Sequence, residues 1–243
     1  MKANFKGRAS IVRAAFLFVL IAGLFGVPVA LFHPDSPLPN EWNPIQPLRV
    51  ADPITPLTGW KLSQARADPE MCLNVLGPSS DFQLLEDKVD SENCSIAPRL
   101  LVQFIGDADL ASIETTCATA LATAMWERHG LQPAAKQLLG SGIGRIEQSG
   151  SYNCRMIRTP SGTGPNWSTH ARAMALDVRG FRTESGQSID LIRDWNGTGP
   201  KAEFLRKARD SACDWFGLTL SPDFNALHAD HFHLQVDGWG GCR

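Results

Sequence analysis

The sequence predicts an α+β fold with a mainly antiparallel sheet flanked by helices, preceded by an apolar N-terminal helix. Segments of helical and of strand character are mixed in the second half of the chain, without the regular strand–helix alternation of a parallel sheet. A length of 243 residues allows one sizeable core. The formal net charge of −2 and the lack of any Lys/Arg run argue against a nucleic-acid partner.

The N-terminal segment is expected to enter a membrane. Residues 14–32 carry no charge, and this stretch exceeds the apolar region of most signal peptides (about 7–15 residues) and suits a spanning helix (roughly 17–25 residues). The length favours a membrane anchor, with a cleaved signal segment as the alternative. Basic residues precede the stretch and none follows until Arg49, so the rest of the chain is expected outside the cytoplasm. The preceding basic residues are Lys2, Lys6, Arg8 and Arg13.

Three regions are predicted along the chain: the anchor or signal segment at 1–33, a linker at 34–68 and a globular domain at 69–243. Proline is so frequent between residues 33 and 58 that helices and interior strands are not expected there. An extended linker would hold the domain away from the membrane surface.

Four helices are predicted in the domain from caps and apolar spacing. The second has Ser112 as its N-cap and Gly130 as its stop, and the third has Pro133 in its first turn. The fourth lines one face with apolar side chains at Phe204, Leu205, Ala208, Ala212 and Trp215. The predicted helices are residues 79–89, 112–130, 132–140 and 200–217.

Five strands are predicted from short apolar or alternating segments. The last of them includes the end of the stretch HADHFH, which runs from His228 to His233 and holds three of the chain's six histidines. The predicted strands are residues 97–105, 142–150, 151–158, 173–182 and 230–236.

All six cysteines follow the apolar segment, where an extracytoplasmic compartment permits disulfides. None has the C-x2-C spacing of a structural zinc site, so three bridges are the preferred interpretation. Proximity in the sequence favours Cys72–Cys94, Cys117–Cys154 and Cys213–Cys242.

The C-terminal histidines suggest a metal site. On a strand, His231 and His233 share one face and Phe232 occupies the other, and neutral imidazole is a common zinc ligand. Upstream, His170 and Asp177 are seven residues apart, which on one helix would separate them by about 10.5 Å, too far for one metal ion. The chain must therefore turn between them, with Asp177 at the start of a strand beside His233.

The spacing S-x-H-x6-D from Ser168 to Asp177, followed by a distal H-x-H, resembles the zinc D-Ala-D-Ala peptidases and the lysostaphin-type and Hedgehog-like metallopeptidases. HADHFH is most similar to the murein endopeptidase version of the motif. The segments GSYNCR, STHARAMALDVRGF, AEFLRKARDSAC and SPDFNALHADHFHL together resemble the extensin-like C-terminal domain of bacterial proteins. This second resemblance covers most of the chain from Cys72 to Arg243.

The resemblance implies a Hedgehog- or DD-peptidase-like fold and a Zn²⁺ ion held by His170, Asp177 and His233. His231 would be the acid or base. Asp230 is the alternative, since it replaces, one methylene shorter, the glutamate that serves as base in the D-Ala-D-Ala peptidases. On a regular strand Asp230 would face away from His233, which favours His231.

The residues around this set are candidates for binding substrate. Arg155 matches the place of an arginine that grips a substrate carboxylate in these enzymes, and its guanidinium suits that task. Tyr152 could donate to an oxyanion, or simply pack in the core. His228 is either a participant or a loop histidine. The tryptophans could line a glycan groove, although burial is their commoner state; they are Trp167, Trp195, Trp215 and Trp239.

The first functional hypothesis is a zinc-dependent peptidase that acts on peptidoglycan peptides at the cell envelope. It would be anchored to the inner membrane with a periplasmic domain, or secreted to the periplasm if the leader is cleaved. The second hypothesis is a non-catalytic module that keeps the fold and the metal and binds the cell wall. The shortened carboxylate at Asp230 is the best support for the second. The oligomeric state is left open.

Overall fold

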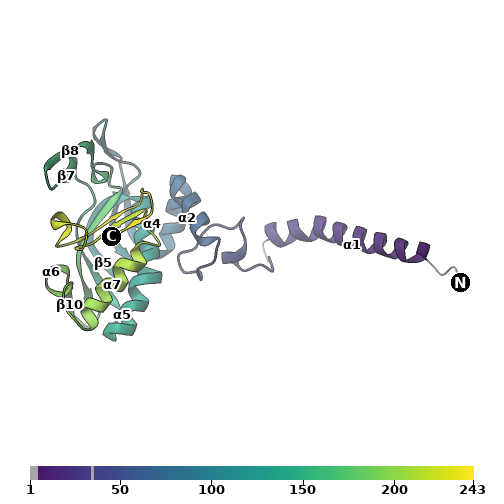
Figure 1. Ribbon diagram of the computed structural model, residues 1–243. Helices are drawn as coiled ribbons and strands as arrows, with labels where there is room; N and C mark the ends of the chain where they lie inside the picture. Colours follow the sequence, from purple (N-terminus) through teal and green to yellow (C-terminus); the bar gives the residue numbers. More distant parts are fainter. Residues whose placement is uncertain (1–4, 34–35) are drawn as a thin grey trace. The chain divides into compact units, whose positions relative to one another are not determined.

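The computed structural model describes residues 5–33 and 36–243, which fall into two units that divide between Leu62 and Ser63. The first unit contains α1 (Phe5–Phe32), a 3-10 turn at Asn40–Trp42 and the start of α2 (Thr58–Ala67) (Figure 1). Its residues Ile11–Phe32 form a helix long and apolar enough to cross a membrane, and a signal sequence near an N-terminus has the same properties. The apolar N-terminal helix is therefore confirmed, and the choice between anchor and signal stays a prediction.

The described part of the proline-rich segment is held by local hydrogen bonds. The buried side chain of Asn43 donates from Nδ2 to the carbonyl of Leu31 (2.9 Å). Further along, Nζ of Lys61 donates to the carbonyl of Asn40 (2.6 Å). The short helix at Asn40–Trp42 departs from the expectation of no helix in this segment, because a three-residue turn starting after a proline needs no donor from that proline.

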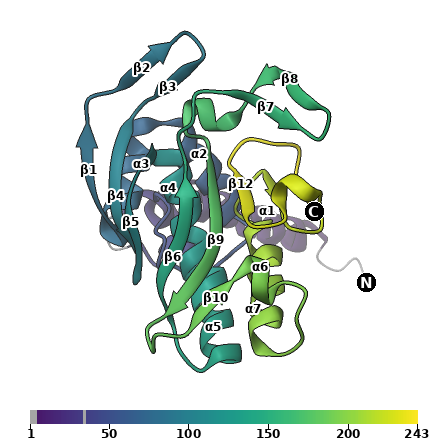
Figure 2. The ribbon, with the colours of Figure 1, turned by 90° about the vertical axis from the view of Figure 1, so that its left-hand side faces the viewer.

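The second unit is built on a nine-stranded sheet with the strand order β1-β4-β5-β6-β9-β12-β11-β13, in which β10 pairs with β9 (Figure 2). All pairs are antiparallel except β5 with β6 and β11 with β13. The mixed α+β architecture with mostly antiparallel strands is thus as predicted. The sheet strands are β1 (Ser80–Leu85), β4 (Arg99–Ile105), β5 (Ala108–Thr116), β6 (Ile143–Gly150), β9 (Ala175–Thr183), β10 (Ser188–Asp190), β11 (Leu218–Leu220), β12 (Phe232–Gln235) and β13 (Gly241–Cys242).

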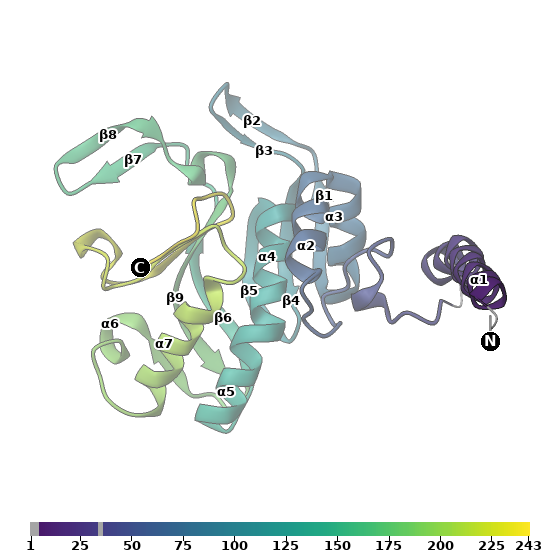
Figure 3. The ribbon, with the colours of Figure 1, turned by 45° about the vertical axis from the view of Figure 1, so that its right-hand side comes forward.

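Two separate hairpins project from the same end of this sheet (Figures 2 and 3). They are β2 (Lys88–Ser91) with β3 (Cys94–Ile96) and β7 (Met156–Thr159) with β8 (Gly162–Trp167). The second unit also contains the helices α3 (Pro69–Leu76), α4 (Cys117–Trp126), α5 (Gln132–Leu139), α6 (Leu191–Asp194) and α7 (Pro200–Ala212), and the 3-10 helices η2 (Gly77–Ser79), η4 (Thr169–Arg172) and η5 (Ala226–His228).

The helices α4, α5 and α7 pack against one face of the sheet (Figure 3). Phe181 of β9 is fully buried between Trp126 of α4 and Phe204 of α7, with ring centroids 5.9 and 5.2 Å away in edge-to-face geometry. The indole nitrogen of Trp126 donates to the carbonyl of Ala208 (2.9 Å), which ties α4 to α7. This face of the sheet is therefore the core, and the opposite face is free to carry polar groups.

Residues 79–89 form strands rather than the predicted helix. Residues Ser80–Leu85 are β1, an edge strand whose pairing partner in the sheet is β4, and Lys88 already begins β2. The apolar spacing of this segment fits a helix, but the hydrogen bonds offered by β4, the third strand after β1 in the chain, decide its conformation.

The predicted helix at 112–130 is correct only from Cys117 onward. Ser112 lies in β5 with a positive φ of 59°, and the helix is capped instead by Thr116, whose hydroxyl accepts from the amide of Thr119 (3.3 Å). Gly130 does not end it, because a π-helical turn at Glu127–Leu131 leads directly into α5. Consecutive β-branched residues before Cys117 favour a strand, and the cap follows them.

The remaining predicted elements agree more closely with the structure. The strands at 97–105, 142–150 and 173–182 correspond to β4, β6 and β9, and the helix at 132–140 corresponds to α5. Residues 151–155 are a loop, so only the end of the strand predicted at 151–158 exists, as β7. Helix α7 buries Phe204, Leu205, Ala208 and Ala212 as predicted but ends before Trp215. Strand β12 begins at Phe232, so His231 precedes it.

The six cysteines form three disulfides, as predicted in number. The bridge Cys213–Cys242 is confirmed, but the other two predicted pairs are wrong. The structure pairs Cys72 with Cys117, which joins α3 to α4, and Cys94 with Cys154, which joins the β2–β3 hairpin to the loop after β6. The pairing of Cys72 with Cys117 depends on how α3 packs on α4. The separation of two cysteines in the sequence gives no information about that packing.

The buried Cys72–Cys117 bridge is expected to stabilise the domain. A Cys72→Ala/Cys117→Ala variant should lose about 2–5 kcal/mol of unfolding free energy in urea titrations, because the bridge constrains the unfolded chain. Peptide mapping of the unreduced protein should recover a peptide pair linked through Cys72 and Cys117. Recovery of a Cys72–Cys94 pair instead would contradict the structure.

Candidate metal centre

The register between β9 and β12 places Asp177 and His233 side by side. The two residues are direct partners across this antiparallel pair, flanked by the pairs Phe232 with Val178 and Leu234 with Leu176. Those flanking side chains are all buried. Because side chains alternate along a strand, the apolar pairs face the core and Asp177 and His233 face the opposite side together.

A tight turn brings His170 to the same point. His170 lies in η4, where the hydroxyl of Ser168 caps the turn by accepting from the backbone amide of His170 (3.3 Å). The turn ends at Ala173, which adopts the left-handed conformation with φ of 50° and directs the chain into β9. The predicted turn between His170 and Asp177 is thus confirmed, and Ser168 orients His170 through the backbone.

The left-handed conformation of Ala173 costs about 1–3 kcal/mol for a residue with a Cβ, and polar contacts hold it in place. Its carbonyl oxygen lies within hydrogen-bond distance of four hydroxyl groups, at 2.8–3.3 Å. These hydroxyls belong to Thr115, Thr116, Thr119 and Ser151. They come from β5, the start of α4 and the loop after β6, so three separate segments fix the turn.

The three predicted ligand atoms form a nearly equilateral triangle. Nε2 of His170 is 3.1 Å from Nδ1 of His233 and 3.2 Å from Oδ1 of Asp177, and the last two atoms are 2.9 Å apart. Ligand atoms around a tetrahedral zinc ion lie about 3.3–3.6 Å apart, given bonds of about 2.0–2.2 Å, so a small outward movement of the three atoms would accommodate the ion. Two imidazoles and one carboxylate are also a donor set that zinc accepts. In both respects these residues fit a zinc ion.

The outer nitrogen of each ring faces an acceptor. Nδ1 of His170 lies 2.9 Å from the carbonyl of Ser151, which can only accept, so that nitrogen carries the proton and Nε2 presents a lone pair to the triangle. Nε2 of His233 lies 3.4 Å from Oε1 of Gln235, but its Nδ1 lies 2.9 Å from the Asp177 carboxylate, which is the stronger acceptor. In the metal-free site Nδ1 of His233 can therefore donate to Asp177, and a cation that displaces this proton meets three acceptor atoms.

Asp177 contributes a negative charge to the triangle. Burial alone would raise the pKa of its carboxyl, but hydrogen bonding and attraction by His170 and His233 outweigh burial and hold the pKa far below its usual range. The carboxylate is therefore ionised at neutral pH, the form in which it can ligate a metal.

His231 lies beside the triangle without belonging to it. Its Nε2 is 3.7 Å from Oδ1 of Asp177, and its Nδ1 is 2.7 Å from Oδ1 of Asp230. The Asp230 carboxylate accepts the Nδ1 proton, which leaves a lone pair on Nε2. The ring is thus oriented by Asp230, whose side chain is itself half exposed (53%).

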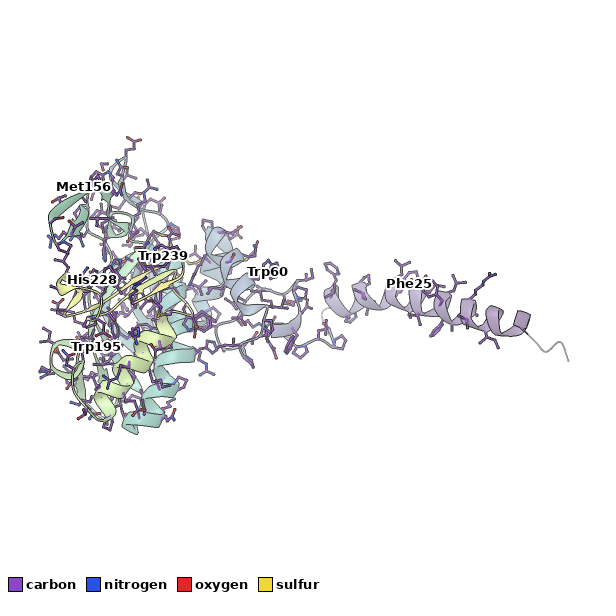
Figure 4. All side chains as sticks on the ribbon, viewed as in Figure 1. Phe25, Trp60, Met156, Trp195, His228 and Trp239 are labelled. Atoms are coloured by element: carbon purple, nitrogen blue, oxygen red, sulfur yellow. A yellow bond between two sulfur atoms is a disulfide. The ribbon has the colours of Figure 1, made fainter. Side chains whose placement is uncertain are left out.

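His228 completes a group of neighbouring imidazoles; it is labelled in Figure 4. Its ring centroid is 5.3 Å from that of His231 and 5.8 Å from that of His233, and its Nδ1 lies 2.8 Å from Oδ1 of Asn225. Burial, followed by the charges of His233 and His231, lowers the pKa of His228 to about 4. It is therefore neutral under physiological conditions.

Arg155 and Tyr152, the two other predicted site residues, make their hydrogen bonds outside the triangle. Arg155 is close enough to Asp177 for their charges to interact, and its Nη1 donates to the carbonyl of Met156 (3.3 Å). The hydroxyl of Tyr152 donates to Asp90 of β2 (2.5 Å), and Lys88 lies over the Tyr152 ring. Burial and then the bond to Asp90 raise the pKa of Tyr152 to about 12. For Tyr152 to donate to an oxyanion, its bond to Asp90 must first break.

The tryptophans divide into two pairs. Trp195 and Trp215 are buried, and Trp167 and Trp239 are exposed. Trp195 packs edge-to-face on Phe232, with centroids 5.6 Å apart, on the core side of β12. Of the four, only Trp167 and Trp239 are exposed enough to contact a polymer.

Sequence reasoning missed the groups that contact the outer ring nitrogens of the histidines: Ser151 beside His170, Gln235 beside His233 and Asn225 beside His228. Ser151 acts through its backbone carbonyl, which leaves no sequence signal. Gln235 is two residues after His233 on a strand, and this spacing alone places both side chains on one face. That signal was available in the sequence.

The fold and the site together define a disulfide-linked α+β domain that carries a candidate His–Asp–His metal centre behind an apolar N-terminal helix. A family model described as Extensin-like protein C-terminus matches residues 70–243. The chain therefore belongs to this family of extensin-like C-terminal domains. No curated protein and no solved structure matches it.

The depressed pKa of His228 predicts a loss of stability in acid. The unfolded histidine binds a proton near pH 6.5 and the folded one only near pH 4, so the unfolded state gains protons first and the free energy of unfolding falls as pH drops between these values. In urea titrations of chelator-treated protein, His228→Gln should lose less stability than wild type from pH 7 to 4. Equal losses in the two proteins would contradict a buried, neutral His228.

Proposed function

We propose that this domain is a zinc-dependent peptidase acting on peptidoglycan peptides at the cell envelope. The observation that carries the proposal is the convergence of one possible ligand atom from each of His170, Asp177 and His233 within 3.2 Å of one another, with an acceptor beside the outer nitrogen of each imidazole. Two imidazoles and a carboxylate on the polar face of a sheet are a donor set that suits zinc once the proton between His233 and Asp177 is displaced.

When bound, zinc supplies Lewis acidity, which lowers the pKa of water and polarises a carbonyl group. His231 supplies the proton transfer. Its Nε2 lone pair is close to the triangle and can accept a proton from water, and Asp230 stabilises the resulting imidazolium from Nδ1. Asp230 orients the base in this assignment and is not the base itself.

The peptide substrate rests on different support. The motif resembles that of the murein endopeptidases, and Arg155 offers a guanidinium near Asp177 that can pair with a substrate carboxylate. The apolar helix and the three disulfides suit a protein that works outside the cytoplasm. Anchoring to the inner membrane with a periplasmic domain is part of the proposal, with secretion to the periplasm as its alternative.

One observation favours the second candidate, a cell-wall-binding module that keeps the metal. The side chain at position 230 reaches His231 and is half exposed, so no carboxylate longer than aspartate stands in the place of the glutamate base. If His231 does not transfer protons, the site has only its ligands and can bind wall peptides without cleaving them.

Three substitutions separate these roles. His233→Ala removes a ligand, so both zinc content, measured by elemental analysis, and hydrolysis of purified peptidoglycan should collapse. His231→Gln leaves three ligands, so zinc should remain while hydrolysis falls by about 10²–10⁴-fold. Asp230→Asn should keep zinc and reduce hydrolysis less than His231→Gln does.

Other outcomes assign the roles differently. Loss of zinc in His231→Gln makes His231 a ligand. A larger defect in Asp230→Asn than in His231→Gln makes Asp230 the base. Wild type that holds zinc and sediments with peptidoglycan without releasing peptides supports the binding module. Wild type that contains no zinc, and whose melting temperature a strong chelator leaves unchanged, contradicts the metal site altogether.

A further inference from the structure

The segment that follows α1 is folded back onto the C-terminal end of that helix. Nδ2 of the buried Asn43 donates to the carbonyl of Leu31 (2.9 Å), and the hydroxyl of Ser36 donates to the carbonyl of Ala30. Carbonyl groups in the last turn of a helix have no partner inside the helix, so these side chains satisfy two of them. The segment is therefore attached to the end of α1 by hydrogen bonds as well as through the chain.

The same segment is also closed on itself. Nζ of Lys61 donates to the carbonyl of Asn40 (2.6 Å), and the hydroxyl of Thr55 donates to the carbonyl of Glu41 (2.9 Å). Lys61 and Asn40 are 21 positions apart in the chain, a length that could span about 70 Å if it were extended. Residues 36–62, which we call the post-helix segment, thus form a closed structure at the end of α1.

The post-helix segment has polar side chains inside and large apolar side chains outside. It exposes five large apolar residues, whereas the second unit, which is several times longer, exposes ten. The five have exposed fractions of 36–57%; they are Leu38, Trp42, Ile45, Ile54 and Trp60. The buried polar residues of the segment are Asn43, Thr55, Thr58 and Lys61, and the buried apolar ones include Leu48 and Val50. An apolar surface of this density indicates a contact with something other than water.

The depth of the segment in a membrane is determined by α1. Residues Ile11–Phe32 are long and apolar enough to cross a membrane, and none of them is buried in the protein. At 1.5 Å per residue, these 22 residues extend about 33 Å, close to the ~30 Å of the hydrocarbon core of a bilayer. With α1 across the bilayer, Phe32 lies at its boundary. Groups that hydrogen-bond to Ala30 and Leu31 then lie within about one helical turn of that boundary.

That depth suits the residues that the segment exposes. Tryptophan is enriched at membrane interfaces, because its ring is apolar and its N–H is polar. Exposed isoleucine and leucine side chains gain free energy when they enter the boundary between headgroups and acyl chains. Of the charged side chains in residues 36–62, only that of Arg49 is exposed, and its charge suits anionic lipid headgroups.

We infer that the post-helix segment is an interfacial element, which lies in the headgroup region of the membrane with Trp42 and Trp60 in contact with lipid. The inference rests on the membrane anchoring that the proposed function includes, and it does not depend on the metal site. Lipid is the partner because the hydrogen bonds to α1 hold the segment at the bilayer boundary. An extended spacer would instead leave the same side chains in water.

The test uses the full chain with its disulfides intact and α1 attached, as verified by intact mass, in phosphatidylcholine vesicles. Part of the lipid carries bromine near the headgroup end of its acyl chains, where it quenches the fluorescence of nearby tryptophans. Helix α1 contains no tryptophan. Trp42→Phe/Trp60→Phe should therefore lose the quenching that wild type shows. Trp167→Phe/Trp239→Phe, which removes two exposed tryptophans of the second unit, is the matched control and should retain it.

The depth of the bromine provides a second reading. Lipid brominated near the end of the acyl chains should quench wild type less than lipid brominated near the headgroup. Quenching that persists in Trp42→Phe/Trp60→Phe, or that disappears in Trp167→Phe/Trp239→Phe, overturns the inference. So does stronger quenching by the deeper bromine.

An alkaline carbonate wash separates failure of the inference from failure of the anchoring. Wild type that stays in the vesicles but is not quenched overturns the inference and leaves the anchoring standing. Wild type that washes off overturns both. The zinc content of the same preparations tests the metal site independently of either result.

A gain of signal decides the matter if Trp42→Phe/Trp60→Phe fails to fold, as judged from its melting temperature. Ile45→Trp adds a tryptophan at an exposed position of the post-helix segment, and Val89→Trp adds one at an exposed position of β2. In otherwise wild-type protein, Ile45→Trp should increase the quenching by brominated lipid and Val89→Trp should not. Equal gains in the two variants, or no gain from Ile45→Trp, overturn the inference.

Discussion

The rest of the site depends on the hydrogen bonds that four hydroxyl groups make to the carbonyl oxygen of Ala173. Asp177 and His233 are brought together by strand pairing alone, but His170 reaches them only if the chain reverses within a few residues, and Ala173 performs this reversal in an unfavourable left-handed conformation. The hydroxyls around its carbonyl oxygen stabilise that conformation. Ser151 takes part twice, because its side chain contacts Ala173 and its backbone carbonyl accepts from His170. The same loop thus holds both the turn and the ring that the turn presents.

Around this turn, two imidazoles and a carboxylate converge on a sheet whose other face is packed core. The outer partners of the rings are all acceptors: a carbonyl for His170, an amide oxygen for His233 and a carboxylate for His231. Each acceptor makes its ring more basic. If a cation binds between His170, Asp177 and His233, these outer contacts strengthen the bonds that its ligands make.

Sequence patterns predict the parts of this protein that local chemistry determines. The spacing from His170 to Asp177 requires a turn, and α7 and β12 follow from their own periodicity. The segment at 79–89 was assigned wrongly because an edge strand depends on its partner, which no local pattern shows. Two disulfides were paired wrongly because Cys72 meets Cys117 only after α3 packs on α4. The ligands carry a motif, whereas a carbonyl such as that of Ser151 has no side-chain signature.

The convergence of these side chains has a thermodynamic consequence for the whole domain. Without a cation, His170 and His233 attract the Asp177 carboxylate, and the core face of the sheet and the disulfide bridges hold the three side chains in place. The Cys94–Cys154 bridge is the most direct of these, because it fastens the loop from Ser151 to Arg155 to the β2–β3 hairpin. If a metal binds only the folded state, its binding free energy adds to the stability of the fold. A bound cation would then displace the proton between His233 and Asp177, so acid would oppose metal binding and the stability that it adds.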